Sequence, residues 1–166
     1  MKRLLVTFNV GEERRPVIND AVADSALVHY LSDAGEGERA ELISSADALL
    51  GWGPGRELSP EEMKSLKPGC LLQLLSAGAD HVPFSDLPEH VRVASNTGAY
   101  AEPMAEHVLA MVLALAKRLL PLHKKLARGE FDQSARNFML SGSVCCILGY
   151  GGIGRATAKL MKPLGV

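Results

Sequence analysis

Hydrophobic residues gather in short runs along the first part of the chain, and more polar stretches separate these runs. The runs are rich in leucine and β-branched residues and have lengths typical of buried parallel strands. They lie at residues 3–8, 26–31, 48–50, 71–75 and 91–94. Most of the stretches between them have helical character, as at 33–45. Strands that alternate with helices predict an α/β fold with an open parallel sheet, covered on both faces and complete near residue 98.

A capping signal marks the start of another predicted helix. In Ser59-Pro60-Glu61-Glu62 a serine stands at the N-cap, a proline at the first helical position and a glutamate at the third. Serine and glutamate in this spacing can satisfy two main-chain N–H groups reciprocally, and proline lacks the N–H that would otherwise be unpaired there. The sequence therefore predicts that a helix opens at Ser59.

A single helical pattern extends from residue 101 to 120 and ends at Pro121. One stripe of it is uniformly apolar and consists of Met104, Val108, Met111, Val112, Leu115 and Leu119. Leucines and alanines fill much of the remaining surface, so this helix must be buried on most sides. A domain junction, a subunit interface or an ordinary core position would each provide that burial. In each case the helix marks the boundary between two units, and residues 121–142 form a polar connection.

The most specific motif is a glycine turn that follows an apolar run at residues 143–148, which predicts a buried parallel strand. A helix over 152–162 is predicted after the turn, with Ile153, Ala156, Leu160 and Met161 facing inward and Pro163 and Gly165 ending it. The pattern is G-x-G-x-x-G, made of Gly149, Tyr150, Gly151, Gly152, Ile153 and Gly154. In that context it is typical of a turn that binds the diphosphate of a dinucleotide. An ordinary glycine-rich turn between a strand and a helix is the alternative.

Each glycine of the motif has a physical reason. Gly149 would allow the sharp change of direction, Gly151 would let the backbone approach a diphosphate, and Gly154 would let the helix lie close to the strand. The unpaired N–H groups at the start of the helix carry partial positive charge, which favours phosphates. The acidic residue that usually binds the ribose lies about 20 residues further on, which is past Val166. The choice between NAD and NADP therefore stays open.

Composition narrows the class of protein. The chain has 166 residues, of which 47% are hydrophobic and 22% charged, as in soluble globular proteins. A net charge of −1 without long charged blocks argues against nucleic acid as a main partner. The longest apolar run, at 108–116, is too short to span a bilayer. The chain begins with an apolar segment that favours a first strand over a signal peptide.

The three cysteines are an odd number, and Cys145 and Cys146 are neighbours in a predicted buried strand. We expect all three to be reduced, in a cytoplasmic protein. No cysteine or histidine cluster has the spacing of a metal site, so no metal is predicted.

Four stretches occur in an order that resembles a known family. They are Leu74-Leu75-Ser76-Ala77-Gly78-Ala79-Asp80-His81, Ser95-Asn96-Thr97-Gly98-Ala99-Tyr100, Ala105-Glu106-His107 and Gly149 to Gly154. Together they resemble the N-terminal half of the D-isomer-specific 2-hydroxyacid dehydrogenases, over essentially the whole chain. The resemblance implies a flavodoxin-like parallel-sheet substrate domain at residues 1–98. A hinge helix and the start of a Rossmann NAD-binding domain would follow at 99–166.

The resemblance also implies an activity. Members of the family interconvert 2-keto acids and D-2-hydroxy acids with NAD(H) or NADP(H), and homodimers are expected. The loop that matches Ser76-Ala77-Gly78 holds the substrate carboxylate through main-chain N–H groups, so Ala77 and Gly78 are candidate substrate-binding residues. Glycine suits this role because an anion can approach an unobstructed backbone. A plain turn at the end of a strand is the alternative for this loop.

Further candidates lie around the same expected cleft. Trp52 and Gly53 follow another predicted strand, and ligands of such sheets bind where the strands end; the tryptophan either walls the pocket or packs. Tyr100 is expected to border the substrate. Met104 matches a position near the nicotinamide ring, or is a core methionine. His107, with Glu106, is expected to tie its helix to neighbouring backbone and not to act in catalysis. The other histidines, at 29, 81, 90 and 123, show no pattern of partners.

The family's catalytic arginine, acidic residue and histidine all follow the glycine turn at a distance, beyond Val166. The sequence therefore predicts no catalytic residue here, and we expect this chain to be a truncated portion that is inactive alone and binds dinucleotide weakly or not at all. Its second part is expected to be partly ordered or sticky, because apolar surface stays bare. Two other functions remain as alternatives: a non-enzymatic NAD-sensing scaffold of the corepressor kind, and a free-standing flavodoxin-like module. The second is disfavoured because the first strand ends in Thr7-Phe8-Asn9, without paired acids for Mg²⁺.

Overall fold

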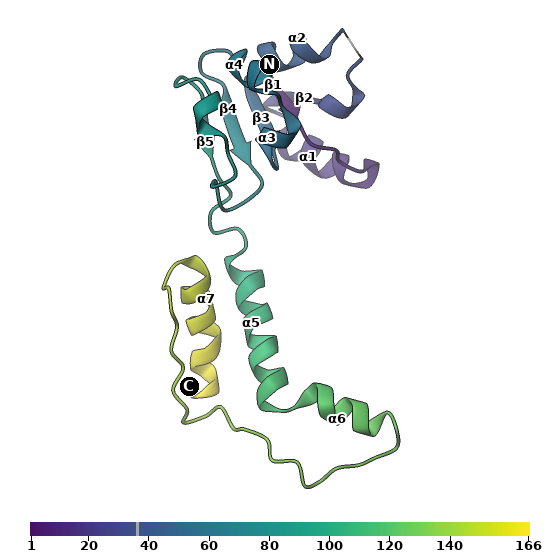
Figure 1. Cartoon of the computed structure of the whole chain (residues 1–166), viewed down its shortest axis with the longest axis vertical. Coiled ribbons are helices and arrows are strands. Elements are labelled where there is room, and N and C mark those ends of the chain that lie inside the picture. The colour runs from purple at the N-terminus through teal and green to yellow at the C-terminus, as the bar shows by residue number, and fades with distance from the viewer. Residues whose placement is uncertain (36) are drawn as a thin grey trace. The chain divides into compact units, whose positions relative to one another are not determined.

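The structure, a computed structural model, describes residues 1–35 and 37–166 (Figure 1). The described residues form two compact units, Met1–Thr97 and Gly98–Val166. We refer to the first as the sheet unit and to the second as the helical unit.

A five-stranded parallel sheet forms the centre of the sheet unit. Its strands are β1 (Lys2–Val6), β2 (Ala26–Tyr30), β3 (Ala48–Gly51), β4 (Leu71–Leu74) and β5 (Arg92–Ala94). They lie in the order β2-β1-β3-β4-β5, and every neighbouring pair is parallel. This is the flavodoxin-like order. The predicted α/β class and parallel sheet are confirmed, and each strand begins and ends within about two residues of its predicted run.

Alternation along the strands divides the core into two layers. Leu5, Leu49 and Leu72 point to one face, where they pack with Ile43 of α2 (Arg39–Ser45) and Met63 of α4 (Pro60–Lys64). The opposite face holds a smaller cluster of Val6, Val10 and Tyr30, against which Ile18 of α1 (Arg15–Val22) packs. The sheet is therefore covered on both faces, as the buried strands required. Shorter helical elements complete the unit: η1 (Glu12–Arg14), η2 (Leu31–Asp33), α3 (Pro54–Glu57) and η3 (Phe84–Asp86).

The helix predicted over 33–45 is shorter in the structure. Only α2, from Arg39, is α-helical, and a 3-10 turn ends at Asp33 before it; residue 36, inside the predicted range, lies outside the described residues. The helix predicted at Ser59 is confirmed with its capping box. Glu62 N donates to Ser59 Oγ at 3.2 Å, and Ser59 N donates to Glu62 Oε2 at 2.8 Å.

One carboxylate links the edges of three elements. Asp47, just before β3, accepts a hydrogen bond from Arg3 N at 2.8 Å, and its Oδ1 lies 3.1 Å from Lys2 Nζ and 3.0 Å from Lys67 Nζ. These donors lower the pKa of Asp47 well below its ordinary value, with the main-chain N–H of Arg3 as the largest cause.

We expect Asp47→Asn to lower the stability of the protein at pH 7. A carboxyl group whose pKa is lowered in the folded state stabilises the fold at pH values above its ordinary pKa of 3.8. This stabilisation is lost progressively as the pH falls below that value. The difference in the free energy of unfolding between wild type and variant should therefore become smaller below about pH 4. Urea unfolding at several pH values measures this, with Asp24→Asn, an exposed carboxylate in no ion pair with the described residues, as control. A gap that stays constant with pH would contradict the linkage.

The helical unit contains α5 (Ala101–Ala116), α6 (Leu119–Leu126), α7 (Gly152–Met161) and η4 (Lys162–Leu164), and α5 packs against α7 (Figure 1). The prediction of one helix over 101–120 is wrong. The helix is interrupted at Lys117 and Arg118, and the backbone of Arg118 is left-handed with φ 53°. In a continuous helix the ring of Pro121 would clash with the carbonyl of Lys117. The break places Pro121 in the first turn of α6, where the N–H that proline lacks would have no acceptor within the helix.

The strand predicted at 143–148 is also absent from the described residues, which contain no strand after β5. The segment is not paired, because a strand forms only against another strand, and residues 98–166 supply none. Its side chains are correspondingly exposed, at 96% for Val144 and 101% for Leu148. Cys145 and Cys146 are exposed and not buried as predicted. In α7, Met161 is buried as expected and Thr157 is buried as well, whereas Ile153 is 43% exposed.

The three cysteines are free, and they differ in exposure, since Cys70 is buried and Cys145 and Cys146 are exposed. Cys70 is fully buried, and burial raises the pKa of its thiol to about 11. Because the thiolate is the reactive form, a thiol reagent should modify Cys145 and Cys146 in the native protein and Cys70 only after unfolding. Mass spectrometry of the alkylated protein with and without denaturant measures this. Native labelling of Cys70 at the rate of the other two would contradict the packing of the sheet core.

No helix in the described parts of the chain is long and apolar enough to cross a membrane.

Candidate functional site

The order of the strands changes direction between β1 and β3. The chain passes from β1 outward to β2 on one side and to β3 and beyond on the other, so the loops after β1 and β3 diverge. Ligands of open parallel sheets bind outside the carboxyl ends of the strands at such a point. Thr7 and Phe8 follow β1 there, and Trp52 and Gly53 follow β3.

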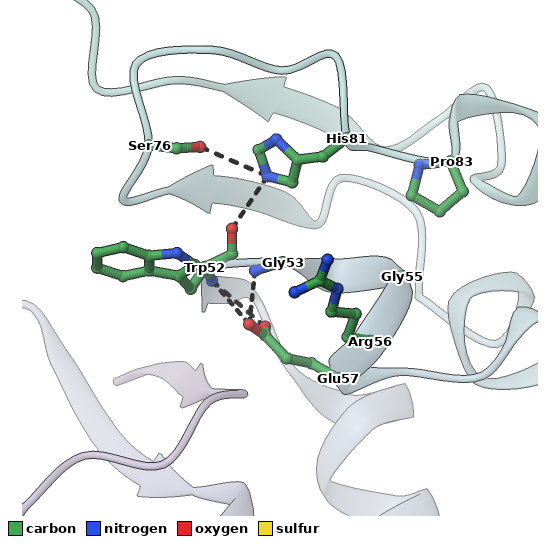
Figure 2. Close-up of a pocket in the computed structure, with 8 residues that line it drawn as sticks. All are labelled: Trp52, Gly53, Gly55, Arg56, Glu57, Ser76, His81 and Pro83. Atoms are coloured by element: carbon green, nitrogen blue, oxygen red, sulfur yellow. Dashed lines mark hydrogen bonds between the residues drawn. The ribbon is translucent and has the colours of Figure 1, made fainter.

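Glu57 holds the loop after β3 in place. Its Oε1 accepts hydrogen bonds from Gly53 N at 2.6 Å and Trp52 N at 3.0 Å, and its Oε2 lies 2.5 Å from the hydroxyl of Thr7. The carboxylate belongs to α3, a helix of four residues that Pro54 opens. One side chain therefore joins the ends of β1 and β3 by accepting from three donors, of which Figure 2 draws the N–H groups of Trp52 and Gly53.

His81 joins the loop after β4 to the same place. Its Nε2 lies 3.0 Å from the carbonyl oxygen of Trp52 and 3.5 Å from Ser76 Oγ, as Figure 2 shows. Ser76 Oγ donates to Gly78 O at 2.8 Å. Because the carbonyl of Trp52 accepts, the proton of a neutral His81 ring belongs on Nε2. The loops after β3 and β4 are thus fixed to each other by side chains.

These loops enclose a pocket of about 580 Å³, a size ordinary for small-molecule sites. It is lined by Trp52, Gly53, Gly55, Arg56, Glu57, Ser76, His81 and Pro83 (Figure 2). Trp52 is 58% exposed and contacts the ring of Phe8 edge-on, with 6.5 Å between the ring centres. Its indole is therefore anchored on one side and open to a ligand on the other.

The predicted substrate-binding residues fall in both units. Trp52 and Gly53 line the pocket, and Ala77 and Gly78 come directly after Ser76, which lines it. Ala77 and Gly78 are exposed, and their main-chain N–H groups donate to no acceptor within the described parts of the chain. Tyr100 belongs to the helical unit, where it is the N-cap residue of α5.

Three polar side chains of this pocket are not among the residues predicted from the sequence. Arg56 and Glu57 were not considered, and His81 was treated as having no partner pattern. A signal for Glu57 was present, because Pro54 at the start of a helix followed by a nearby glutamate resembles the capping signal at Ser59. Arg56 and His81 left no such signal, since their roles depend on loops that meet only in the folded sheet.

The glycine turn of the helical unit has the geometry that its pattern predicted. Gly149 has φ +92°, a conformation that side chains rarely adopt. A Cβ on Gly154 would stand 2.2 Å from the carbonyl oxygen of Gly149, whereas a Cβ on Gly151 would meet nothing within 4 Å. Gly154 therefore has no room for a side chain, because the helix packs against the turn there, whereas Gly151 faces open space.

The helix that follows presents bare main-chain N–H groups. The first amides of α7, those of Gly152, Ile153 and Gly154, have no acceptor within the helix. Gly151, the N-cap residue, has no side chain to cap them. An anion with several oxygens fits this arrangement.

One predicted role on α5 is not reproduced, and one alternative is excluded within the helical unit. Glu106 and His107 were expected to tie the helix to neighbouring backbone, but both are exposed and form no hydrogen bond or ion pair with the described residues. Met104, in the first turn, is 44% exposed, so it is not a core methionine within the helical unit.

Comparison with known proteins shows which family the chain resembles. Residues 109–166 match the family model described as the NAD-binding domain of D-isomer-specific 2-hydroxyacid dehydrogenases. A formate dehydrogenase of Neurospora crassa is 31% identical over 132 residues, which are 76% of this chain and 34% of that protein. The crystal structure of a glycerate dehydrogenase related protein from Thermoplasma acidophilum is 32% identical, with a TM-score of 0.69 over 98% of this chain and 51% of that one. The chain belongs to the D-isomer-specific 2-hydroxyacid dehydrogenase family.

Other members of the family have similar relationships to the chain. A D-lactate dehydrogenase from Aquifex aeolicus, crystallised with NAD and lactic acid, has a TM-score of 0.71 and 25% identity over 99% of this chain and 49% of that one. A mouse glyoxylate reductase/hydroxypyruvate reductase is 29% identical over 58% of this chain and 31% of its own length. The chain thus spans about a third of these curated relatives and about half of these solved structures. The family model is that of an NAD-binding domain, which confirms the predicted nicotinamide cofactor at the level of the family.

Proposed function

We propose that the chain belongs to an NAD(P)-dependent oxidoreductase that interconverts 2-keto acids and D-2-hydroxy acids by hydride transfer. The observation that carries this proposal is the glycine turn of the helical unit. Gly149 needs its positive φ, Gly154 leaves no room for a side chain, and the space over Gly151 is open. A turn built this way at the start of a helix suits a dinucleotide diphosphate.

The proposed cofactor residues follow from that turn. The main-chain N–H groups of residues 149–154 would hold the diphosphate, through Gly149, Tyr150, Gly151, Gly152, Ile153 and Gly154. Met104, exposed in the first turn of α5, would lie near the nicotinamide ring. The cofactor, NAD or NADP, supplies or accepts the hydride when bound.

The sheet unit supplies the proposed substrate site. The free N–H groups of Ala77 and Gly78 would bind the substrate carboxylate, with Trp52 and Gly53 forming a wall and Tyr100 bordering the substrate. In this assignment residues 1–98 are the substrate domain, and residues 99–166 are the hinge helix and the beginning of the dinucleotide-binding domain.

The residues described here bind and orient, and we propose that they do not complete the reaction alone. Hydride arriving at the carbonyl carbon leaves a developing oxyanion that needs a proton from a general acid. The arginine, histidine and acidic residue that the family uses do not match any motif position in this chain. We also propose a cytoplasmic homodimer for the whole protein.

Reduction of a panel of 2-keto acids, followed by nicotinamide absorbance with NADH and with NADPH, tests the proposed function. Consumption of either cofactor with at least one keto acid, yielding the D-hydroxy acid, is the expected result. Dinucleotide binding without turnover of any 2-keto acid or D-hydroxy acid by the whole protein would instead favour the non-enzymatic scaffold. The same assay on residues 1–166 alone is expected to give no turnover.

A further inference from the structure

Among the charged side chains that line the pocket of the sheet unit, Arg56 alone has no hydrogen bond or ion pair with the described residues. In the sheet unit, Arg3, Arg14, Arg15 and Arg39 bind a described side chain. Arg56 and Arg92 form no hydrogen bond or ion pair with the described residues, and of these two only Arg56 lines the pocket. Figure 2 shows its guanidinium extending into the space among Gly53, His81 and Pro83.

The neighbouring carboxylate forms no ion pair with this guanidinium. Glu57 directs both of its oxygens to the N–H groups of Trp52 and Gly53 and to the hydroxyl of Thr7. Arg56 therefore presents an exposed guanidinium without an ion-pair partner at a concave site, and guanidinium groups bind anions through paired N–H donors.

We infer that the substrate is a 2-keto acid with a second anionic group, a carboxylate or a phosphate, at the end remote from the keto acid, and that Arg56 binds this group. The inference rests on the proposed function. The substrate's first carboxylate would occupy the N–H groups of Ala77 and Gly78, on the loop after β4, and Arg56 reaches the pocket from α3. Ser76, directly before Ala77, lines the pocket with Arg56, and the pocket volume of about 580 Å³ exceeds what a two-carbon or three-carbon keto acid needs.

Substrate selectivity of the whole protein tests the assignment. We would compare pyruvate and 2-ketobutyrate, which carry one charge, with 2-ketoglutarate and phosphohydroxypyruvate, which carry a second anionic group. Arg56→Met is expected to lower kcat/KM for the acids with two anionic groups by about 10- to 100-fold, the loss of a charge-assisted bidentate contact. The singly charged acids should be affected less than about twofold, and Arg56→Lys should retain part of the preference. The acid preferred by the wild type distinguishes a carboxylate from a phosphate.

A second readout does not require turnover. Trp52, the only tryptophan of the chain, lines the same pocket and is largely exposed. Titration of its fluorescence with 2-ketoglutarate or phosphohydroxypyruvate should give saturable binding that Arg56→Met weakens. Arg92→Met, the other unpaired arginine of the sheet unit, is the matched control and should bind as the wild type does.

The outcomes separate the two proposals. If no keto acid is reduced but Arg56-dependent binding is seen by fluorescence, the proposed function fails and the anion site stands. If keto acids are reduced and Arg56→Met lowers kcat/KM equally for both classes, or for neither, the role of Arg56 is overturned. Absence of both turnover and Arg56-dependent binding overturns it as well.

Discussion

Replacing Gly154 by alanine is expected to destabilise the helical unit by about 3 kcal/mol, the upper part of the range for overpacked sites. The new Cβ would stand 2.2 Å from the carbonyl oxygen of Gly149 and 3.3 Å from Cγ2 of Ile147. A main-chain oxygen cannot rotate away as a flexible side chain can. The start of α7 must therefore move away from the turn, and the bare N–H groups would no longer converge.

When the N–H groups at the start of α7 no longer converge on one point, the affinity for the cofactor should fall. We expect Gly154→Ala to weaken NAD or NADP binding at least tenfold, since misplacing even one or two hydrogen bonds to a charged group costs about 1.4 kcal/mol or more. Calorimetric titration of the whole protein with each dinucleotide measures the affinity, and urea unfolding measures the stability.

Gly152, two residues before Gly154 in the same helix, gives a matched control for stability. A Cβ on Gly152 would lie 3.5 Å from Cβ of Ala101, an ordinary van der Waals contact. Gly152→Ala should therefore leave the stability unchanged or raise it slightly, because alanine is the better helix former. Equal effects of the two substitutions would mean that the close approach of Gly154 to Gly149 does not exist in the protein.

The two units show how far local sequence determines structure. The strands of the sheet unit were predictable because each is a short apolar run with a parallel neighbour on at least one side. The helix at Ser59 was predictable because its capping residues act within one turn. The glycine turn was predictable for the same reason, since Gly149 and Gly154 constrain each other over five residues.

Predictions failed where the outcome depends on distant partners. The apolar run before Gly149 has the composition of a strand, but pairing is a property of two segments, and residues 98–166 provide only one. The break at Arg118 shows a different failure, because Pro121 acts one turn before its own position. His81 could not be assigned a partner from sequence, because the carbonyl it contacts is 29 residues away.

Glu57 is the second residue whose replacement should have a large effect. Glu57→Ala would remove the acceptor of the N–H groups of Trp52 and Gly53 and a partner of the Thr7 hydroxyl, which is 8% exposed as a residue. Leaving such donors unpaired costs about 1–3 kcal/mol, so we expect the sheet unit to lose about 2 kcal/mol. Urea unfolding of the variant measures the loss.

The functional consequence of Glu57→Ala should exceed the loss of stability. The same loop carries Trp52 and is followed by Arg56, so both walls of the pocket depend on the position that Glu57 imposes. We expect the variant, where still folded, to bind 2-keto acids at least tenfold more weakly, because misplaced groups no longer converge on a substrate. Trp52 fluorescence should change as well, since its main-chain N–H is released.

Glu57→Gln separates the shape of this side chain from its charge. The glutamine oxygen can still accept from Gly53, and the Thr7 hydroxyl can turn its proton to the carbonyl of Leu50, 3.2 Å away, and accept from the new amide. Most of the stability should then return, whereas the affinity for anionic substrates should stay at or above the wild-type value because a negative charge beside Arg56 has gone. Glu89→Ala, an exposed carboxylate without a hydrogen bond or ion pair to the described residues, serves as the control. If Gln were as damaging as Ala, the charge of Glu57 and not its geometry would hold the loop.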